Sequence, residues 1–109
     1  MKPSVLAIDD SRTIRELLRQ PIESAGFIYF TAEDGVEGIE RFQQLTPDVV
    51  ITDINMPRKD GYGVIKDIRN GAENTFVPIL VLTTESSDEA KARARDAGAT
   101  GWIVKPFND

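Results

Sequence analysis

The sequence predicts an α/β domain built on a doubly wound, five-stranded parallel sheet. Five short apolar runs alternate with segments of helical periodicity, and several runs are apolar on both faces, as expected for strands that helices cover on both sides. The 109 residues, 40% of them hydrophobic, are enough for one domain with a single core. The expected strands are residues 5–8, 27–30, 49–52, 79–82 and 102–104.

The first helical segment carries an apolar stripe with spacings of three and four residues. We expect Thr13 and Glu16 to form its capping box and Gly26 to end it. Pro21 lies inside the stripe and removes a backbone hydrogen bond, which predicts a kink. The stripe consists of Ile14, Leu17, Leu18, Ile22 and Ala25.

Three further helical segments follow the next three strands. The second begins at Asp34, a good capping residue, and stops before Pro47. The third is weaker, and the fourth is rich in alanine and ends at Gly98. The third helix is marked by Val64, Ile65 and Ile68, and the capping box of the fourth by Ser86 and Glu89.

The composition excludes several kinds of site. The chain contains no cysteine and no histidine, so disulfides, thiolate metal sites and nucleophiles activated by histidine are ruled out. Any metal must be bound by oxygen, which favours Mg²⁺, Ca²⁺ or Mn²⁺. The net charge of −5 and the pI near 4.7 argue against nucleic acid as a partner. Neither a signal peptide nor a membrane span is recognisable, so we expect a cytoplasmic protein.

Polar residues follow four of the expected strands at their carboxyl ends. They are Asp9 and Asp10, Asp53, Thr83 and Lys105. A parallel topology brings these ends to one edge of the sheet, where ligands bind in doubly wound folds. Three carboxylates against one ammonium group need a counter-ion, and a hard divalent cation supplies it. One carboxylate is then placed to act as a nucleophile toward a phosphoryl group, while the hydroxyl and the lysine neutralise the phosphoryl oxygens.

Four motifs, in this order, carry a family resemblance: IDDSRTIR, ITDINMPRKDG, LVLTTES and GWIVKPF. The chain resembles, over its whole length of 1–109, the receiver domain of two-component response regulators, and especially single-domain chemotaxis regulators of the CheY type. This resemblance implies a flavodoxin-like or CheY-like sheet with strand order 2-1-3-4-5. It also implies a phosphorylated signalling switch of a phosphorelay, in the cytoplasm and with a function in chemotaxis, rather than an enzyme with a separate substrate.

The resemblance assigns roles around the acidic cluster. Asp53 would accept a phosphoryl group from the phosphohistidine of a histidine kinase. Asp10, Asp53 and the backbone carbonyl of Asn55 would bind Mg²⁺, or Mn²⁺ as a substitute, and Asp9 would act mainly through water.

Further roles are implied for signalling. Thr83 and Lys105 would contact the phosphoryl group, and Thr83 and Trp102 would form the switch pair. The bond between Lys105 and Pro106 would be cis, and a downstream protein would bind the face made by the fourth helix and the fifth strand. Three residues would tune dephosphorylation: Asn55 and Glu85 would flank the attacking water, and the bulk of Thr84 would slow access.

Two features depart from the family. The switch aromatic, usually Tyr or Phe, is Trp102 here, and the sequence stops at KPFND, where the family continues into a fifth helix. We therefore expect a receiver truncated after the fifth strand. Right-handed crossovers would place one helix on one face of the sheet and three on the other. Part of the first face would be bare and covered by a second copy, a swapped segment or another partner.

Other functional interpretations of the sequence compete with that of a receiver domain. A phosphatase similar to the haloacid dehalogenases also uses an aspartate at a strand end, but it needs a second aspartate where this chain has Asn55. A P-loop is missing, and the glycines at 61 and 63 match a dinucleotide fingerprint only in part. A degenerate receiver that binds partners without phosphorylation stays open as the alternative.

Overall fold

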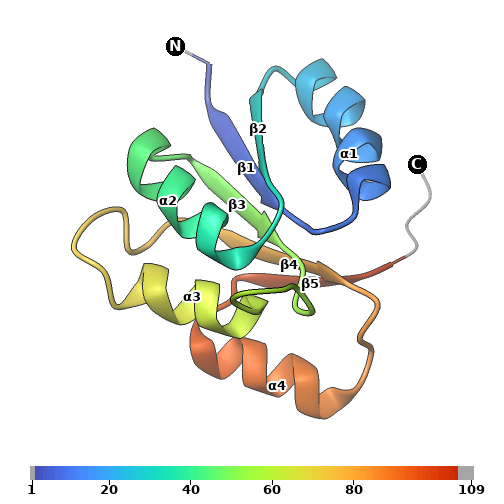
Figure 1. Ribbon diagram of the computed structural model, residues 1–109, viewed down its shortest axis with the longest axis vertical. Coiled ribbons are helices and arrows are strands. Elements are labelled where there is room, and N and C mark those ends of the chain that lie inside the picture. Colours follow the sequence, from blue (N-terminus) through green and yellow to red (C-terminus); the bar gives the residue numbers. More distant parts are fainter. Residues whose placement is uncertain (1, 106–109) are drawn as a thin grey trace.

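The computed structural model describes residues 2–105, in which strands and helices alternate from the first strand to the last (Figure 1). Every expected strand and helix is present. The strands are β1 (Ser4–Ile8), β2 (Ile28–Ala32), β3 (Val49–Thr52), β4 (Ile79–Thr83) and β5 (Gly101–Val104), and the helices are α1 (Arg12–Ser24), α2 (Gly35–Leu45), α3 (Gly61–Arg69) and α4 (Asp88–Ala97).

The five strands form one parallel sheet in the order β2-β1-β3-β4-β5, which confirms the predicted fold class and strand order. β1 lies between β2 and β3, and its register pairs Ile8 with both Ala32 and Thr52. The strands therefore end at the same level, and the residues that follow them share one edge of the sheet. The ladder extends by one bond beyond β1 and β3, because the Asp53 N–H donates to the Ile8 carbonyl at 2.9 Å.

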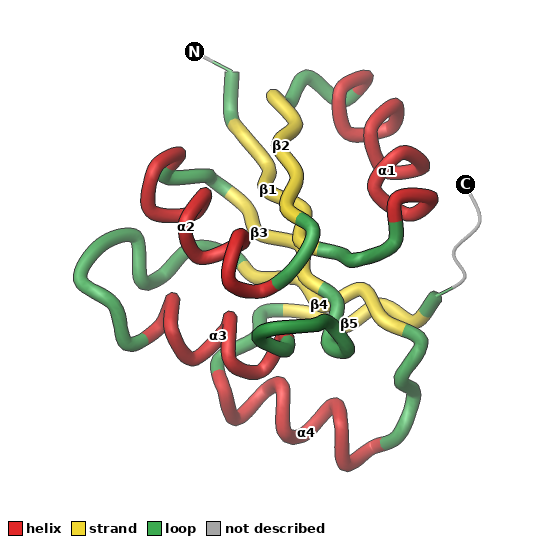
Figure 2. The backbone as a smooth tube through the Cα atoms, in the orientation of Figure 1, coloured by secondary structure: helices red, strands yellow, loops and turns green. Residues whose placement is uncertain are grey.

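The helices divide unequally between the two faces of the sheet (Figures 1 and 2). α1 packs against β1 and β2 on one face, whereas α2, α3 and α4 form a row on the other. The larger core lies under this row and contains the side chains of Leu6, Val50, Ile65 and Ile79, none of them exposed. The smaller core under α1 contains Ala7, Leu18, Tyr29 and Leu82.

The face that α1 covers is open beside β4 and β5. An apolar cleft of about 130 Å³ lies there, and the Ile103 side chain at its rim is 46% exposed. One helix is about 10 Å wide, whereas five strands span roughly 20 Å, so within residues 2–105 α1 covers only part of this face. The cleft is lined by Leu18, Ile51, Leu80, Leu82 and Ile103.

Some local expectations were wrong. The cap of α1 is Ser11, not Thr13, because the Ser11 hydroxyl accepts the Ile14 N–H at 3.3 Å. The cap of α4 is Ser87, not Ser86, for the same reason: its hydroxyl accepts the Ala90 N–H at 3.1 Å. β2 starts one residue later than expected and continues to residue 32, since backbone pairing with β1 does not depend on apolar side chains.

Two further predictions concern Pro21 and the bond before Pro106. The helical pattern of α1 continues past Pro21 to Ser24. The expected cis bond before Pro106 lies outside the described residues.

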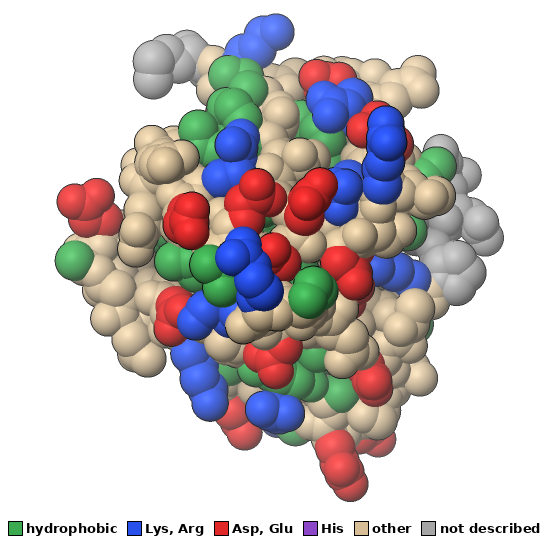
Figure 3. Space-filling model, viewed as in Figure 1, with side chains coloured by type: hydrophobic (Ala, Val, Ile, Leu, Met, Phe, Trp, Pro, Cys, Tyr) green, Lys and Arg blue, Asp and Glu red, His purple; other side chains and the backbone are tan. Residues whose placement is uncertain are grey.

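Within residues 2–105, no helix is long and apolar enough to cross a membrane. The face shown in Figure 3 carries acidic and basic side chains interspersed with one another.

Candidate functional site

The structure brings three carboxylates together at the carboxyl edge of the sheet. Asp9 and Asp10 follow β1, and Asp53 follows β3, its neighbour in the sheet. One carboxylate oxygen from each lies within 4.8 Å of the others. Asp9 and Asp53 are buried, at 3% and 8% exposure, whereas Asp10 is exposed. Three anions so close together repel one another, and a site with this donor set attracts a cation.

Lys105 lies against two of these carboxylates. Its Nζ donates to Asp9 Oδ2 and to Asp53 Oδ2, both at 2.8 Å, and the Lys105 side chain is only 9% exposed. The backbone N–H of Lys105 donates to the Thr83 carbonyl at 2.7 Å, which holds the residue at the end of the β4–β5 ladder. Burial alone would lower the pKa of Lys105, but the hydrogen bonds to Asp53 and Asp9 outweigh burial and raise it. The ammonium group is therefore charged at neutral pH.

The two buried carboxylates have different surroundings. Burial raises the pKa of Asp9 above its usual value, although hydrogen bonds from Lys105 and from the Ser11 N–H oppose this shift. Both oxygens of Asp53 accept a hydrogen bond: Oδ1 from the Ile54 N–H at 2.6 Å, and Oδ2 from Lys105. The Asp53 side chain is thus held in one orientation with its carboxylate toward the cluster.

Thr83 is the last residue of β4, the neighbour of β3 in the sheet, and Thr84 and Glu85 follow it. The Thr83 side chain is fully buried, and its hydroxyl accepts the Glu85 N–H at 3.4 Å. Thr84 is exposed. Glu85 and Asn55 line one shallow cavity of about 250 Å³, between the β3–α3 loop and the start of α4. The structure therefore brings together the two residues that the sequence assigned to flank a water molecule.

Trp102 lies on β5, opposite Val81 of β4, and its partly buried ring packs against the larger core. Its Nε1 is buried and has no hydrogen-bond partner among residues 2–105. A buried N–H without a partner has a free-energy cost, so the present rotamer leaves a donor that another arrangement could satisfy.

The structure adds contacts that the sequence did not indicate. Arg15 of α1 donates from Nη1 to the backbone carbonyl of Asp9 at 2.6 Å and so fixes the peptide that leads to Asp10. In the β3–α3 loop, Arg58 pairs with Asp34 at the start of α2. Gly61 lies so close to the backbone of Asp53 that a Cβ would overlap its carbonyl oxygen. A pattern of apolar and polar residues carries no signal for such contacts, because they join distant segments.

The residues present fit a hard divalent cation. Carboxylate oxygens from separate loops, without histidine or cysteine, are the donor set of Mg²⁺ sites in proteins. Two of the three carboxylates, those of Asp9 and Asp53, are already held by hydrogen bonds without a metal, from the Ser11 N–H, the Ile54 N–H and Lys105.

Comparisons with known proteins agree with this geometry. Residues 5–109 match the family model of the response regulator receiver domain. Chemotaxis protein CheY4 of Vibrio cholerae is 44% identical, with a TM-score of 0.93 over 99% of this chain and 90% of that one. A response regulator from Chloroflexus aurantiacus, known from its crystal structure, is 31% identical in sequence to this chain. Its TM-score is 0.93, over 99% of this chain and 88% of that one.

Curated relatives point to other contexts. The "Probable transcriptional regulator ycf27" of Guillardia theta is 40% identical over 98% of this chain, and response regulator MprA of Mycobacterium leprae is 39% identical over 94%. The chain spans only 41% and 44% of the length of these two proteins.

The chain belongs to the family of response regulator receiver domains of two-component systems. Receiver domains of this family act as phosphorylation switches. Receiver domains bind Mg²⁺ at an acidic pocket, and they interact with histidine kinases and with downstream targets.

Proposed function

We propose that Asp53 is the phospho-acceptor of this receiver. An Asp53 oxygen attacks the phosphorus of a phosphohistidine on a histidine kinase, the P–N bond breaks, and its electron pair stays on the imidazole nitrogen. The observation that carries the proposal is the position of Asp53, buried at the end of β3 between a lysine and two further carboxylates. Mg²⁺, when bound, neutralises negative charge on the phosphoryl oxygens.

We propose a division of roles among the metal ligands. Asp10, Asp53 and the Asn55 backbone carbonyl hold Mg²⁺ directly, Asp9 acts through water, and Mn²⁺ substitutes. The greater exposure of Asp10 supports this division, because an exposed carboxylate is free to turn toward an ion, whereas Asp9 is already bonded to Lys105. Mg²⁺ titrations should show a larger loss of affinity for Asp10→Ala than for Asp9→Ala. Equal losses would contradict the division.

Thr83 and Lys105 are proposed to contact the phosphoryl group. Lys105 would exchange one of its carboxylate partners for a phosphoryl oxygen, since both bonds are made by the same Nζ. Thr83 would turn its hydroxyl toward the phosphoryl group, and the Trp102 ring would move into the space it leaves. Adding beryllofluoride with Mg²⁺ should therefore change the fluorescence of Trp102, the only tryptophan. An unchanged spectrum would contradict this switch.

The phosphorylated state is proposed to be short-lived. Asn55 and Glu85 line one cavity, which would let a water molecule approach the phosphoryl group. The bulk of the neighbouring Thr84 would slow this approach. Replacing Asn55 and Glu85 with apolar residues should lengthen the lifetime of the phosphorylated state.

The decisive experiment is phosphorylation of the protein with acetyl phosphate and Mg²⁺, followed by mass spectrometry. The wild-type protein should gain one phosphate, Asp53→Asn should gain none, and Asp96→Asn, an exposed aspartate of α4, should behave as wild type. Labelling of Asp53→Asn would refute the assignment. No labelling of any form would favour the alternative, a degenerate receiver that binds partners without phosphorylation.

The signal is proposed to leave through α4 and β5, where Lys91, Arg95 and Trp102 line a second cavity. A chemotaxis protein as target, in the cytoplasm, is supported by the similarity to CheY4. The curated relatives support transcription as the competing output. A pull-down with and without beryllofluoride distinguishes the two outputs by the protein captured.

The open cleft beside β5 is proposed to be covered in solution by a second copy, a swapped segment or another partner. Its five lining side chains are all apolar, so contact of this cleft with water is unfavourable. Analytical ultracentrifugation at micromolar concentration should show a dimer if a second copy covers it, and a monomer excludes that occupant.

A further inference from the structure

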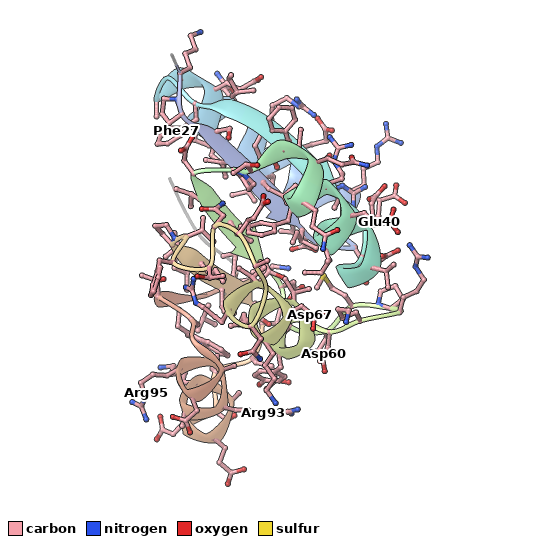
Figure 4. All side chains as sticks on the ribbon, turned by 90° about the vertical axis from the view of Figure 1, so that its left-hand side faces the viewer. Phe27, Glu40, Asp60, Asp67, Arg93 and Arg95 are labelled. Carbon is pink, nitrogen blue, oxygen red and sulfur yellow. The ribbon has the colours of Figure 1, made fainter. Side chains whose placement is uncertain are left out.

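The loop between β3 and α3 is held from the side of α2. This loop contains Asp53, Asn55 and Arg58, and it ends at Asp60, which is labelled in Figure 4. Arg58 has a φ of 67°, in the left-handed region that non-glycine residues rarely adopt. Such a conformation persists only where the surroundings impose it.

Asp34 imposes it through two parallel hydrogen bonds. Arg58 Nε donates to Asp34 Oδ2 at 2.9 Å, and Nη2 donates to Oδ1 at 3.1 Å. This geometry is directional, since both partners are planar. Asp34 is itself fixed, because its Oδ1 also accepts the Glu37 N–H at 2.9 Å and so caps α2. The hydrogen bonds from Arg58 and Glu37 lower the pKa of Asp34, which keeps it charged at neutral pH.

A second contact presses the same two segments together. A Cβ on Gly35, the first residue of α2, would overlap the carbonyl oxygen of Lys59. The far end of the loop is fixed by the Gly61 N–H, which donates to the Ile54 carbonyl at 2.8 Å, and by an ion pair between Lys59 and Asp67 of α3. The backbone around Asn55 is thus enclosed between fixed points, and the Asp34–Arg58 pair is the side-chain contact that joins the loop to α2.

We propose that Asp34 and Arg58 are positioning residues, which hold the β3–α3 loop so that the Asn55 carbonyl is directed toward the carboxylate cluster. This inference rests on the proposed function, in which that carbonyl is a metal ligand. An ion pair as exposed as this one contributes little to stability, since water screens it. Its effect is therefore expected on metal affinity, through the order of the loop, more than on folding.

The sharpest test is Arg58→Gly. Glycine adopts a positive φ without strain, so the melting temperature should stay the same or rise. Mg²⁺ affinity should nevertheless fall about tenfold, the lower end of the loss that is typical when a residue that orients a metal ligand is removed. Charge alone predicts the opposite, because losing a cation near the site would strengthen Mg²⁺ binding. Lys66→Gln removes an exposed cation from α3 and is the matched control, with affinity expected near that of the wild type.

A second variant and a second readout complete the test. Asp34→Asn should weaken Mg²⁺ binding in the same direction, and the double variant should be no weaker than the weaker single variant, since both remove one interaction. In the metal-free proteins, amide hydrogen exchange across residues 54–60 should be faster in both variants than in the wild type and in Lys66→Gln.

The outcomes separate the inference from the proposed function. If the wild type does not bind Mg²⁺, the proposed function fails, and hydrogen exchange in the metal-free proteins still decides whether the pair orders the loop. If the wild type binds Mg²⁺ and Asp10→Asn does not, but Arg58→Gly matches the wild type in affinity and exchange, the inference alone is overturned. A parallel fall of melting temperature and affinity in Arg58→Gly would also overturn it, because the pair would then be structural only.

Discussion

The two faces of the sheet differ in how firmly they are covered. Under α2, α3 and α4, the side chains of β1, β3 and β4 are enclosed by a continuous helical layer. Under α1, the helical cover within residues 2–105 ends before β4 and β5, and Ile103 reaches solvent. Within residues 2–105, the helical layer is therefore continuous on one face and incomplete on the other, beside β4 and β5.

The largest contrast is expected between two core truncations. Ile65→Ala, in α3 on the covered face, should lower the free energy of unfolding by about 3–5 kcal/mol, because the residue is fully buried and the cavity cannot collapse. Leu80→Ala, in the open cleft, should cost less than about 2 kcal/mol, since the side chain is only partly buried. Urea unfolding of both variants measures the difference, and equal losses would show that both faces are equally covered.

The pH dependence of stability that Tyr29 causes reports how closely α1 packs on its part of the sheet. Burial raises the pKa of Tyr29 to about 12 from 10.0, and its hydroxyl donates to the Arg15 carbonyl at 2.6 Å. The neutral phenol is therefore favoured in the folded state. The stability it contributes is complete below pH 10 and is lost as pH rises through the folded pKa, a loss of about 2–3 kcal/mol.

The measurement is the free energy of unfolding of the wild type relative to Tyr29→Phe, which cannot ionise at this position. The relative stability of the wild type should fall between pH 10 and pH 12, while contributions from lysines cancel in the comparison. A constant difference would mean that the Tyr29 phenol is accessible to water and that α1 packs loosely.

Two glycines offer a matched pair. A Cβ at Gly38 of α2 would overlap the buried side chain of Ile8, so Gly38→Ala should cost about 1–2 kcal/mol despite the better helix propensity of alanine. A Cβ at Gly101 of β5 would meet only the end of the Leu80 side chain, which borders the open cleft and can turn away. Gly101→Ala should therefore change stability by less than about 0.5 kcal/mol. A larger loss at Gly101 than at Gly38 would reverse the comparison.

The smallest effect is expected at Ile103. Ile103→Thr keeps a β-branched side chain at an exposed position and should change the free energy of unfolding by less than about 0.5 kcal/mol. Thermal melts at two protein concentrations provide the check. If the variant melts further below the wild type at the higher protein concentration, a second copy of the chain covers this face.

The fold could be predicted from the sequence because its signals are local. The apolar run of β3 ends at residue 52, and Asp53 follows directly, so topology alone placed that carboxylate at the site. Helix caps are less distinct, since adjacent serine or threonine residues compete: Ser87 is the cap, not Ser86. The pairing of Asp34 with Arg58 across 24 positions could not be predicted, because neither residue type indicates a partner and the left-handed backbone at an arginine has no sequence signal.

The bonds of Lys105 also set the time at which the site becomes complete. Lys105 lies 96 positions after Asp9 and 52 after Asp53, so these contacts close long loops and form late in folding. At about 5–20 residues per second, a ribosome makes the paired aspartates several seconds before it makes Lys105. A nascent chain therefore exposes its acidic cluster without the lysine that neutralises it. Docking of β5 onto β4 is the event that ends this interval.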